Sequence, residues 1–523
     1  MAMADKDARL DSKSEMPEVI EAETVEANSC RTQKTDTEAL QAEHREYLET
    51  RHGTVNKFPL PSADPEEPLN WPAWKKNTTL ITLSLHSLIA TYTPNSVSPA
   101  FLIISKDFNV SVSTATYLLG AALLPMGLSS LLWVPISNRF GRRPMWLMAS
   151  LLPACFNIGL ALVDNFPGQV VLEVLSGFFL SPALTLVSAV VTELFFWEER
   201  GQKMGMWTSA LTMGPPLAPF LMGFVVERTG TYKYIFYSQA AALFLIFFMH
   251  IFCTPETMYK RRKPRNYHKS NFSHQYTRIS EYPDAPLNIA TFALPLKLFT
   301  YPNILIPAMV QGVVLNFASV FMSVEIPVIF PQKFGSTPSQ VGCQFVGLIV
   351  GTMIGGWLGG RGSDMWMERR KKRHSTETVQ AEHRLALCYP ANALCIVGAL
   401  VFCIGLARST HLHYTVVPAV GAFLLAVGNQ MLGNSMVTYS IDCHVEYSHT
   451  IGFFFNMWRM VLGFVGPFYY PSMVGSCGFY GLAGVMIGCF IALSIFPTVA
   501  IHLWGQKLRL RKGEHEVVEM RRG

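Results

Sequence analysis

The chain has 523 residues, of which 50% are hydrophobic and 15% are charged, and its formal net charge is +6. Soluble chains carry about 25% charged residues on average, so this composition excludes an ordinary soluble domain. The charges gather in residues 1–76, 259–297, 361–384 and 506–523, which leaves the stretches between them almost uncharged. A basic excess confined to such segments indicates membrane topology and not a nucleic-acid partner.

The sequence also lacks the motifs of common catalytic and cofactor sites. It has no phosphate-binding loop with G-K-[ST] and no recognisable Ser-His-Asp set, so we expect neither an ATP-driven pump nor an enzyme. Its cysteines number 10 and are scattered without a CxxC pair. We therefore predict no disulfide framework, no metal site and no bound cofactor.

Twelve apolar segments follow a polar N-terminal stretch. Residues 1–60 are acidic and polar with few aromatic residues, and we predict that residues 1–76 form a disordered cytosolic tail. A helix needs about 20 apolar residues to cross a bilayer core of about 30 Å, and an open strand edge cannot be satisfied in lipid. The chain is therefore predicted to be an all-α membrane protein with twelve transmembrane helices. The predicted spans are 78–100, 113–136, 144–163, 168–192, 204–226, 234–254, 302–329, 341–360, 385–406, 414–438, 450–471 and 478–503.

The polar stretch after the sixth span divides the chain into two halves. We predict an N-terminal six-helix bundle over 77–256, a cytosolic central loop over 257–301, a C-terminal six-helix bundle over 302–505 and a cytosolic C-tail over 506–523. Lys and Arg are concentrated in the central loop, in the C-tail and in the loops after spans two and eight. The positive-inside rule then places both termini in the cytosol. Two related halves with a substrate between them are typical of transporters.

The loop between spans two and three carries the sharpest local motif, Asn138-Arg-Phe-Gly-Arg-Arg-Pro144. Gly141 permits a tight turn, and Arg139, Arg142 and Arg143 can pair with carboxylates or helix C-termini on neighbouring helices. We predict that this loop forms a clasp, meaning polar contacts that hold neighbouring helix ends together and gate the passage. Asp364 follows span eight at the matching place in the second half, which favours the clasp over simple positive-inside anchoring.

Span five contains Gly214, Pro215 and Pro216 in the stretch Gly214-Pro-Pro-Leu-Ala-Pro219. Small residues allow two helices to approach closely, and prolines bend a helix. We predict that this stretch belongs to the gating machinery. Close packing without a role in gating is the alternative interpretation.

Two carboxylates, Glu173 in span four and Glu325 in span seven, lie within apolar segments. A carboxylate inside the membrane is costly unless it is paired, hydrated or protonated, so each is a candidate functional site. Glu173 could take and release a proton or attract a cationic substrate. The competing interpretation is that Glu173 lies near the end of its helix and reaches water.

Other polar residues of the spans are predicted to line a central cavity together with these acids. Gln311 and Glu325 are separated by two seven-residue steps and are predicted to share a helix face. Gln430 and Asn434 are four residues apart, and Asn456 and Arg459 are three apart, so each pair is predicted to point one way. We expect Arg459 to pair with Glu325, either as part of a cavity or as a permanent structural ion pair.

With these motifs in view, the chain resembles transporters of the major facilitator superfamily, in particular fungal drug:proton antiporters of the twelve-span type. The family loop signature G-x-x-x-D-R-x-G-R-R-P is similar to residues 134–144, with Val134 and Asn138 in place of the glycine and the acid. The acid bonds across to another helix in that family, and Asn138 carries no charge for that role. The proline-rich motif of span five is similar to the family's antiporter motif. Further similar motifs are Asp64-Pro-Glu-Glu-Pro-Leu-Asn-Trp71, Pro255-Glu-Thr-Met-Tyr259, Glu382-His-Arg-Leu385 and Tyr439-Ser-Ile-Asp442.

The resemblance implies a secondary active transporter that alternates a central cavity between the membrane faces. Proton-coupled efflux of a hydrophobic or amphipathic small molecule, such as a drug or a secondary metabolite, is the implied function. Proton-coupled uptake of an organic cation or nutrient is the first alternative, and a receptor that binds without transport is the second. The implied partners are a small-molecule substrate, protons and the lipid bilayer, with no nucleic acid. We expect a monomer in the plasma membrane, with the vacuolar membrane as the alternative location.

Overall fold

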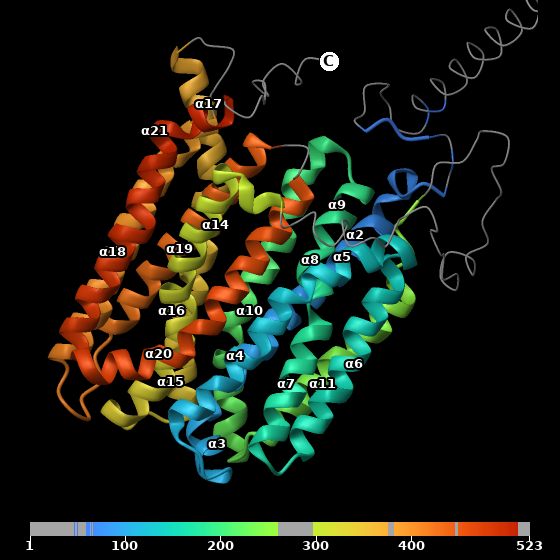
Figure 1. Ribbon diagram of the computed structural model, residues 1–523. Coiled ribbons are helices and arrows are strands. Elements are labelled where there is room, and N and C mark those ends of the chain that lie inside the picture. The colour runs from blue at the N-terminus through green and yellow to red at the C-terminus, as the bar shows by residue number, and fades with distance from the viewer. Residues whose placement is uncertain are drawn as a thin grey trace, which may run out of the picture. The chain divides into compact units, whose positions relative to one another are not determined.

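The computed structural model describes residues 59–62, 64, 66–259, 297–374, 381–444 and 448–510, together with residues 47 and 50. Most of the predicted N-tail, the central loop and the C-tail lie outside the described residues. The chain divides into two parts, one made of Met1–Trp71 and Tyr259–Lys269 and the other of Pro72–Met258 and Ser270–Gly523. Every regular element that the structure describes is a helix (Figure 1).

The first part contains a short 3-10 helix, η1 (Pro68–Asn70), within the motif Asp64–Trp71. The Asn70 side-chain amide donates to the carbonyl of Asp64 at 2.8 Å, and the Trp71 indole N–H donates to the carbonyl of Glu66 at 3.2 Å. The Tyr259 hydroxyl donates to the Asp64 carboxylate at 2.5 Å. Burial and the Asp64 carboxylate raise the pKa of the Tyr259 hydroxyl. Two of the motifs found in the sequence therefore contact each other.

The first half of the second part is a helical bundle, here called the N-terminal bundle. Its elements are α2 (Ala73–Asn95), η2 (Ser98–Ala100), α3 (Phe101–Asp107), α4 (Val112–Leu128), α5 (Ser130–Phe140), α6 (Arg142–Leu162), α7 (Phe166–Leu180), α8 (Pro182–Thr185), α9 (Val187–Leu194), α10 (Trp197–Thr229) and α11 (Lys233–Cys253).

The second half of this part is here called the C-terminal bundle. Its elements are η4 (Leu298–Thr300), α14 (Pro302–Leu315), η5 (Asn316–Val320), α15 (Phe321–Phe334), α16 (Pro338–Trp357), η6 (Leu358–Gly362), α17 (Ser363–His374), η7 (Ala381–Leu387), α18 (Cys388–Arg408), α19 (Val417–Cys443), α20 (Ser448–Phe490), η9 (Ile491–Ile495) and α21 (Phe496–Leu510). The elements η5, η6 and η9 are π-helical segments inside longer helices.

The membrane-spanning helices are consistent with the predicted number of spans. Among the described residues, 9 helices are long and apolar enough to cross a membrane, or 10 if α4 and α5 count as one span bent by 45°. The stretch Thr450–Leu508 has 59 residues and would be about 88 Å long as one helix, far more than a bilayer needs. Gly478 interrupts it with a φ of 63°, so it makes two passages. Counting this stretch as two passages and adding the helix α2, which is rich in Ser and Thr, gives an arrangement that is consistent with twelve spans.

Two pairs of helices join the bundles. Helix α10 packs along α16, and α4 packs along α20 (Figure 1). Gly223 on α10 and Gly342 on α16 are required for this approach, because a Cβ at Gly223 would lie 2.5 Å from the carbonyl oxygen of Pro338 and one at Gly342 would lie 2.9 Å from that of Pro219. The contact lies toward the end of the bundles opposite Gly141. We call the end that carries Arg142 and Arg384 the basic end, and the other the opposite end.

Candidate substrate cavity and helix-end clasps

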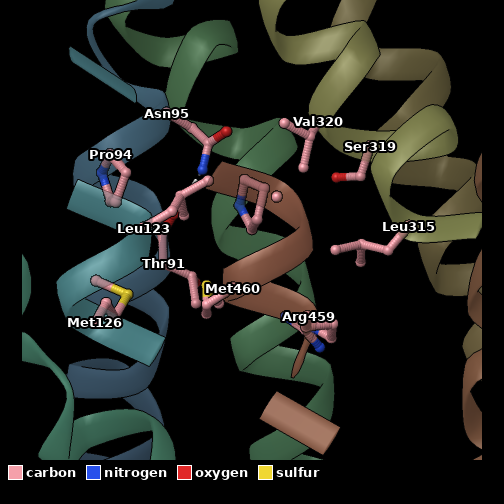
Figure 2. Close-up of a pocket in the computed structure, with 12 residues that line it drawn as sticks. Thr91, Pro94, Asn95, Leu123, Met126, Leu315, Ser319, Val320, Arg459 and Met460 are labelled. Atoms are coloured by element: carbon pink, nitrogen blue, oxygen red, sulfur yellow. Dashed lines mark hydrogen bonds between the residues drawn. The ribbon is translucent and has the colours of Figure 1, made fainter. Parts of the chain in front are cut away.

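A cavity of about 40 Å³ lies between the two bundles near the middle of the spans. A water molecule needs about 10–15 Å³ of such space, so the cavity has room for a few waters and not for a drug-sized molecule in this conformation. Figure 2 shows Thr91 and Asn95 on the side of α2, Leu315 and Ser319 on the opposite side, and Arg459 on α20. The lining residues are Thr91, Pro94, Asn95, Leu123, Met126, Pro215, Leu315, Ser319, Val320, Arg459, Met460 and Gly463.

Among the predicted polar cavity residues, Arg459 is the one that lines this cavity. Its Nε atom is buried and has no hydrogen-bond partner in the described part of the chain. Asn456 lies one turn earlier on α20, and it is 6% exposed with neither amide atom hydrogen-bonded there. The prediction that these two side chains share a helix face fits this spacing.

Glu325 lies within the C-terminal bundle and not in the cavity. Its side chain is 1% exposed and lies close enough to Tyr470 to interact electrostatically with it. The Tyr470 hydroxyl donates to the carbonyl of Asn316 at 2.7 Å, and the Asn316 amide donates to the Tyr469 hydroxyl at 3.0 Å. Asn316 therefore bonds a neighbouring helix. The expected ion pair between Glu325 and Arg459 is not formed between these two described residues.

The prediction that Gln311 and Glu325 share a face assumed a uniform α-helix, which the π-helical segment η5 interrupts. A π-helix carries more residues in each turn than an α-helix, so this segment, Asn316–Val320, changes the angular register between α14 and α15. Gln311 packs against α19, where a Cβ at Gly433 would lie 2.9 Å from its Nε2. Glu325 lies close enough to Tyr470 on α20 to interact with it electrostatically.

Glu173 is buried inside the N-terminal bundle on α7. It is 1% exposed, and its Oε2 has no hydrogen-bond partner among the described residues. The alternative that it reaches water is therefore wrong. Gly177, one turn further along α7, packs against α4, since a Cβ there would lie 2.3 Å from the carbonyl oxygen of Ala122. Positions four apart share a helix face, which directs Glu173 toward α4. Glu173 is not among the residues that line the cavity between the bundles.

Gln430 and Asn434 point the same way on α19, as predicted. The Gln430 amide donates to the Asn434 side-chain oxygen at 3.4 Å. The Asn434 amide donates to the carbonyl of Gly356 at 3.3 Å. Gln430 also reaches Thr212 of α10 at 3.5 Å, so this pair contributes to the contact between the bundles.

The loop motif after α5 forms a clasp within the N-terminal bundle. Gly141 has a φ of 91°, which favours glycine, and a Cβ there would lie 2.5 Å from a Glu256 carboxylate oxygen. The Glu256 carboxylate accepts the backbone N–H groups of Arg142 at 2.9 Å and Arg143 at 3.0 Å, which caps the start of α6. Burial raises the pKa of Glu256, while the backbone donors of Met258, Arg143 and Arg142 act in the opposite direction.

The arginine side chains of this loop bind neighbouring helices, as predicted. Arg142 forms an ion pair with Glu193 at the end of α9, at 3.1 Å, and also donates to the Ser137 hydroxyl. Arg143 donates to the carbonyl of Ile251 near the C-terminus of α11, at 3.1 Å. Arg139 and Asn138 occupy the last turn of α5. We call Ser137, Arg142, Arg143, Glu193 and Glu256 the N-terminal clasp.

A second clasp holds the basic end of the C-terminal bundle. Arg384 of η7 forms ion pairs with Asp364 of α17 at 3.0 Å and with Asp442 of α19 at 2.6 Å. These three residues are here called the C-terminal clasp. Asp364 was predicted from its position, whereas Arg384 and Asp442 were present only as parts of sequence motifs without an assigned role. The same is true of Glu256 in the N-terminal clasp.

The three residues of span five that were predicted to take part in gating have different surroundings. Gly214 lies against α2, because a Cβ there would be 2.6 Å from the carbonyl oxygen of Leu88. Pro215 lines the cavity, and Pro216 is buried. The segment therefore links the packing of α2 on one side with the contact to α16 near Gly223 on the other.

A buried histidine pair was missed from the sequence. His250 Nε2 lies 2.9 Å from His86 Nδ1, His86 Nε2 lies 3.3 Å from the carbonyl of Ala149, and His250 Nδ1 lies 3.0 Å from the Thr254 hydroxyl. Trp146 stacks on His250. A neutral Nε2–H tautomer of both rings satisfies every one of these contacts. The network joins α2, α6 and α11, which no spacing in the sequence indicated.

Comparisons with known proteins agree with this architecture. The family model described as Major Facilitator Superfamily matches residues 83–467. Polyamine transporter 3 of Saccharomyces cerevisiae is 24% identical over 455 residues, which cover 86% of this chain and 72% of the relative. Efflux pump vrtL of Penicillium aethiopicum is 24% identical over 456 residues, covering 86% and 88%. The crystal structure of a D-xylose-proton symporter has a TM-score of 0.56 at 16% identity and covers 80% of this chain and 97% of its own.

The fold and the cavity between two helical bundles define a multi-pass membrane transporter of small molecules. The chain belongs to the Major Facilitator Superfamily, because the family model covers most of its length.

Proposed function

We propose that this transporter exports a hydrophobic or amphipathic small molecule in exchange for protons. The observation that carries the proposal is the cavity between the bundles, which is lined by helices of both, together with one buried carboxylate inside each bundle that has no cationic partner in the described chain. The name of the relative called an efflux pump supports the direction of transport. The proline-rich segment of span five, with Pro215 on the cavity wall, supports it as well.

The distribution of basic residues supports a cytosolic basic end and cytosolic termini. The contact at Gly223 and Gly342 then lies on the outer side, so this conformation is closed toward the outside. We infer that the N-terminal bundle over 77–256 and the C-terminal bundle over 302–505 move against each other during transport, with the two clasps holding each bundle together at its cytosolic end. We also propose that the protein acts as a monomer in the plasma membrane.

Glu173 and Glu325 are the proposed proton sites, one in each bundle. Both are buried, and each has a carboxylate oxygen without a hydrogen-bond partner in the described chain. A buried carboxylate in apolar surroundings is stabilised by a proton, so its protonation state changes with the water access that alternating conformations provide. Neither acid lines the cavity, so protons and substrate would occupy separate sites.

A second candidate function is proton-coupled uptake of an organic cation or nutrient. The name Polyamine transporter 3 of one relative favours an organic cation as the substrate. The two functions differ in the direction of substrate movement relative to the proton gradient. A transport assay with an imposed proton gradient therefore separates them.

The test uses full-length protein in sealed vesicles of known orientation with an imposed proton gradient. Efflux by antiport predicts that hydrophobic substrates move opposite to the protons and that collapsing the gradient stops the movement. Movement in the same direction as the protons would favour uptake. Movement that is unchanged when the gradient is collapsed would exclude proton coupling.

A further inference from the structure

The charge on the wall of the central cavity is positive. Among the residues that line it, Arg459 is charged and the others are neutral. The two buried acids that sequence reasoning placed in this cavity lie inside the separate bundles instead. The cavity therefore offers a guanidinium group to a ligand and no carboxylate.

The guanidinium of Arg459 has unused binding capacity. Arginine remains protonated in proteins and has five N–H donors in a planar fork. The described chain supplies no ion-pair partner to Arg459, and its Nε has no hydrogen-bond partner. A charge in a partly desolvated site is stabilised by a bound counter-ion, and a carboxylate matches the fork with two parallel hydrogen bonds.

A second observation concerns a residue next to Arg459 that does not itself line the cavity. Asn456 is 6% exposed, and neither its amide nitrogen nor its oxygen has a hydrogen-bond partner among the described residues. Buried amides are normally satisfied, so an unsatisfied one calls for a missing partner. Asn456 lies one turn from Arg459 on the same side of α20.

The rest of the cavity suits an apolar molecular body. Leu123, Met126, Leu315, Val320 and Met460 supply apolar surface. Thr91, Asn95 and Ser319 add hydrogen-bonding groups across from α20 (Figure 2). Sites for small molecules combine mostly apolar walls with a few polar groups that fix orientation.

We infer that the substrates are amphipathic organic anions, with the anionic group on Arg459 and the apolar body between α2, α4 and the α14–α15 helix. This inference rests on the proposed transport function and specifies its substrate class. It also separates export of anions from uptake of organic cations, because an unbalanced guanidinium repels a cation in the same cavity.

Binding of three probes with one aromatic body tests the charge preference. The probes are 2-naphthoate, 2-naphthamide and 2-naphthylmethylamine, which are anionic, neutral and cationic at pH 7. Their affinities are measured by isothermal titration calorimetry on the full-length protein in nanodiscs. We expect naphthoate to bind about tenfold or more tightly than either other probe, the effect of a charge-assisted hydrogen-bonded pair.

The variants assign the preference to Arg459. Arg459→Gln is expected to abolish the preference for naphthoate, and Arg459→Lys to keep the preference over the amine with weaker affinity. Arg408→Gln is the matched control, because Arg408 is an exposed arginine at the end of α18 and far from the cavity lining. It is expected to bind like the wild type. If Arg459→Gln is not monodisperse, the preference of Arg459→Lys for naphthoate over the amine tests the inference instead.

An equal affinity for the three probes, a preference for the amine, or a lack of saturable naphthoate binding overturns the inference. So does a preference that persists in Arg459→Gln, or equal binding of naphthoate and the amine by Arg459→Lys. Vesicle transport distinguishes this result from failure of the proposed function. Arg459-dependent binding of naphthoate without proton-driven movement of any probe would remove the antiport and leave the anion site. Proton-driven movement of the amide or amine without an Arg459-dependent preference would remove the anion site and leave the proton-coupled transport.

Discussion

The carboxylate of Glu227 near the end of α10 accepts a hydrogen bond from the backbone N–H of Ser339 in the first turn of α16, at 2.9 Å. The bond joins the N-terminal bundle to the C-terminal bundle beside the glycine contact at the opposite end. A carboxylate at a helix N-terminus is favoured by the unsatisfied N–H groups and the helix dipole. This pair therefore stabilises the conformation that is closed at that end.

Replacing Glu227 by Gln should shift the equilibrium away from the closed conformation. The amide is neutral and loses the dipole interaction, and an exposed contact of this kind changes a population by about two- to fivefold. Spin labels at positions 229 and 336, in a background without the native cysteines, report the distance across the contact. We expect a larger fraction of long distances in Glu227→Gln.

Glu199→Gln is the control, since it neutralises an exposed glutamate at the other end of the same helix. An unchanged distance distribution in Glu227→Gln would show that the packing of α10 on α16 holds the contact without Glu227.

The N-terminal clasp predicts a coupling between Arg142 and Glu193. Their ion pair is partly buried, with side-chain exposures of 8% and 25%. In a double-mutant cycle with Arg142→Met and Glu193→Gln, each single change should lower stability, and the coupling energy should be about 1–2 kcal/mol. Thermal unfolding of the protein in nanodiscs measures these values. Strictly additive effects would contradict a direct interaction.

Glu256 predicts a pH dependence of stability. Burial holds its pKa in the folded protein above the value of about 4.3 in an unfolded chain. The folded state then binds the proton more tightly, so the stabilisation by Glu256 is fully present below that value and is lost as pH rises through the folded pKa. The stability difference between wild type and Glu256→Gln should therefore fall with rising pH in this window. Chemical unfolding at a series of pH values measures it. A difference that rises with pH would mean that the backbone N–H donors of Arg142 and Arg143 outweigh burial.

The proposed proton sites predict an effect on coupling. Glu173→Gln and Glu325→Gln keep the shape of the side chain but cannot titrate, so each should reduce the pH dependence of transport while insertion into the membrane stays intact. Transport rates in vesicles at several pH values are the measurement. Glu199→Gln again serves as the control, because Glu199 is an exposed glutamate at the start of α10. Normal pH dependence in both variants would remove these residues from the coupling role.

Much of the fold could be predicted because the bilayer imposes simple requirements. The thickness of the apolar core sets the length of each span, and the need to satisfy backbone groups in lipid selects helices. The loop at Gly141 was also predictable, since its turn and its arginines act over a few residues. The partners of those arginines, Glu193 and the carbonyl of Ile251, lie far along the chain and are supplied only by packing.

The sequence by itself determined a helical membrane protein and the glycine turn with its arginines at Gly141, because hydropathy, charge and glycine act locally. Only the tertiary structure decided which polar residues meet. The π-helical segment at Asn316–Val320 changed the helix register between Gln311 and Glu325, and packing placed Glu173 inside its own bundle. Arg459 was left facing the cavity. These outcomes depend on helix register and on contacts between distant segments, which residue spacing along one helix does not specify.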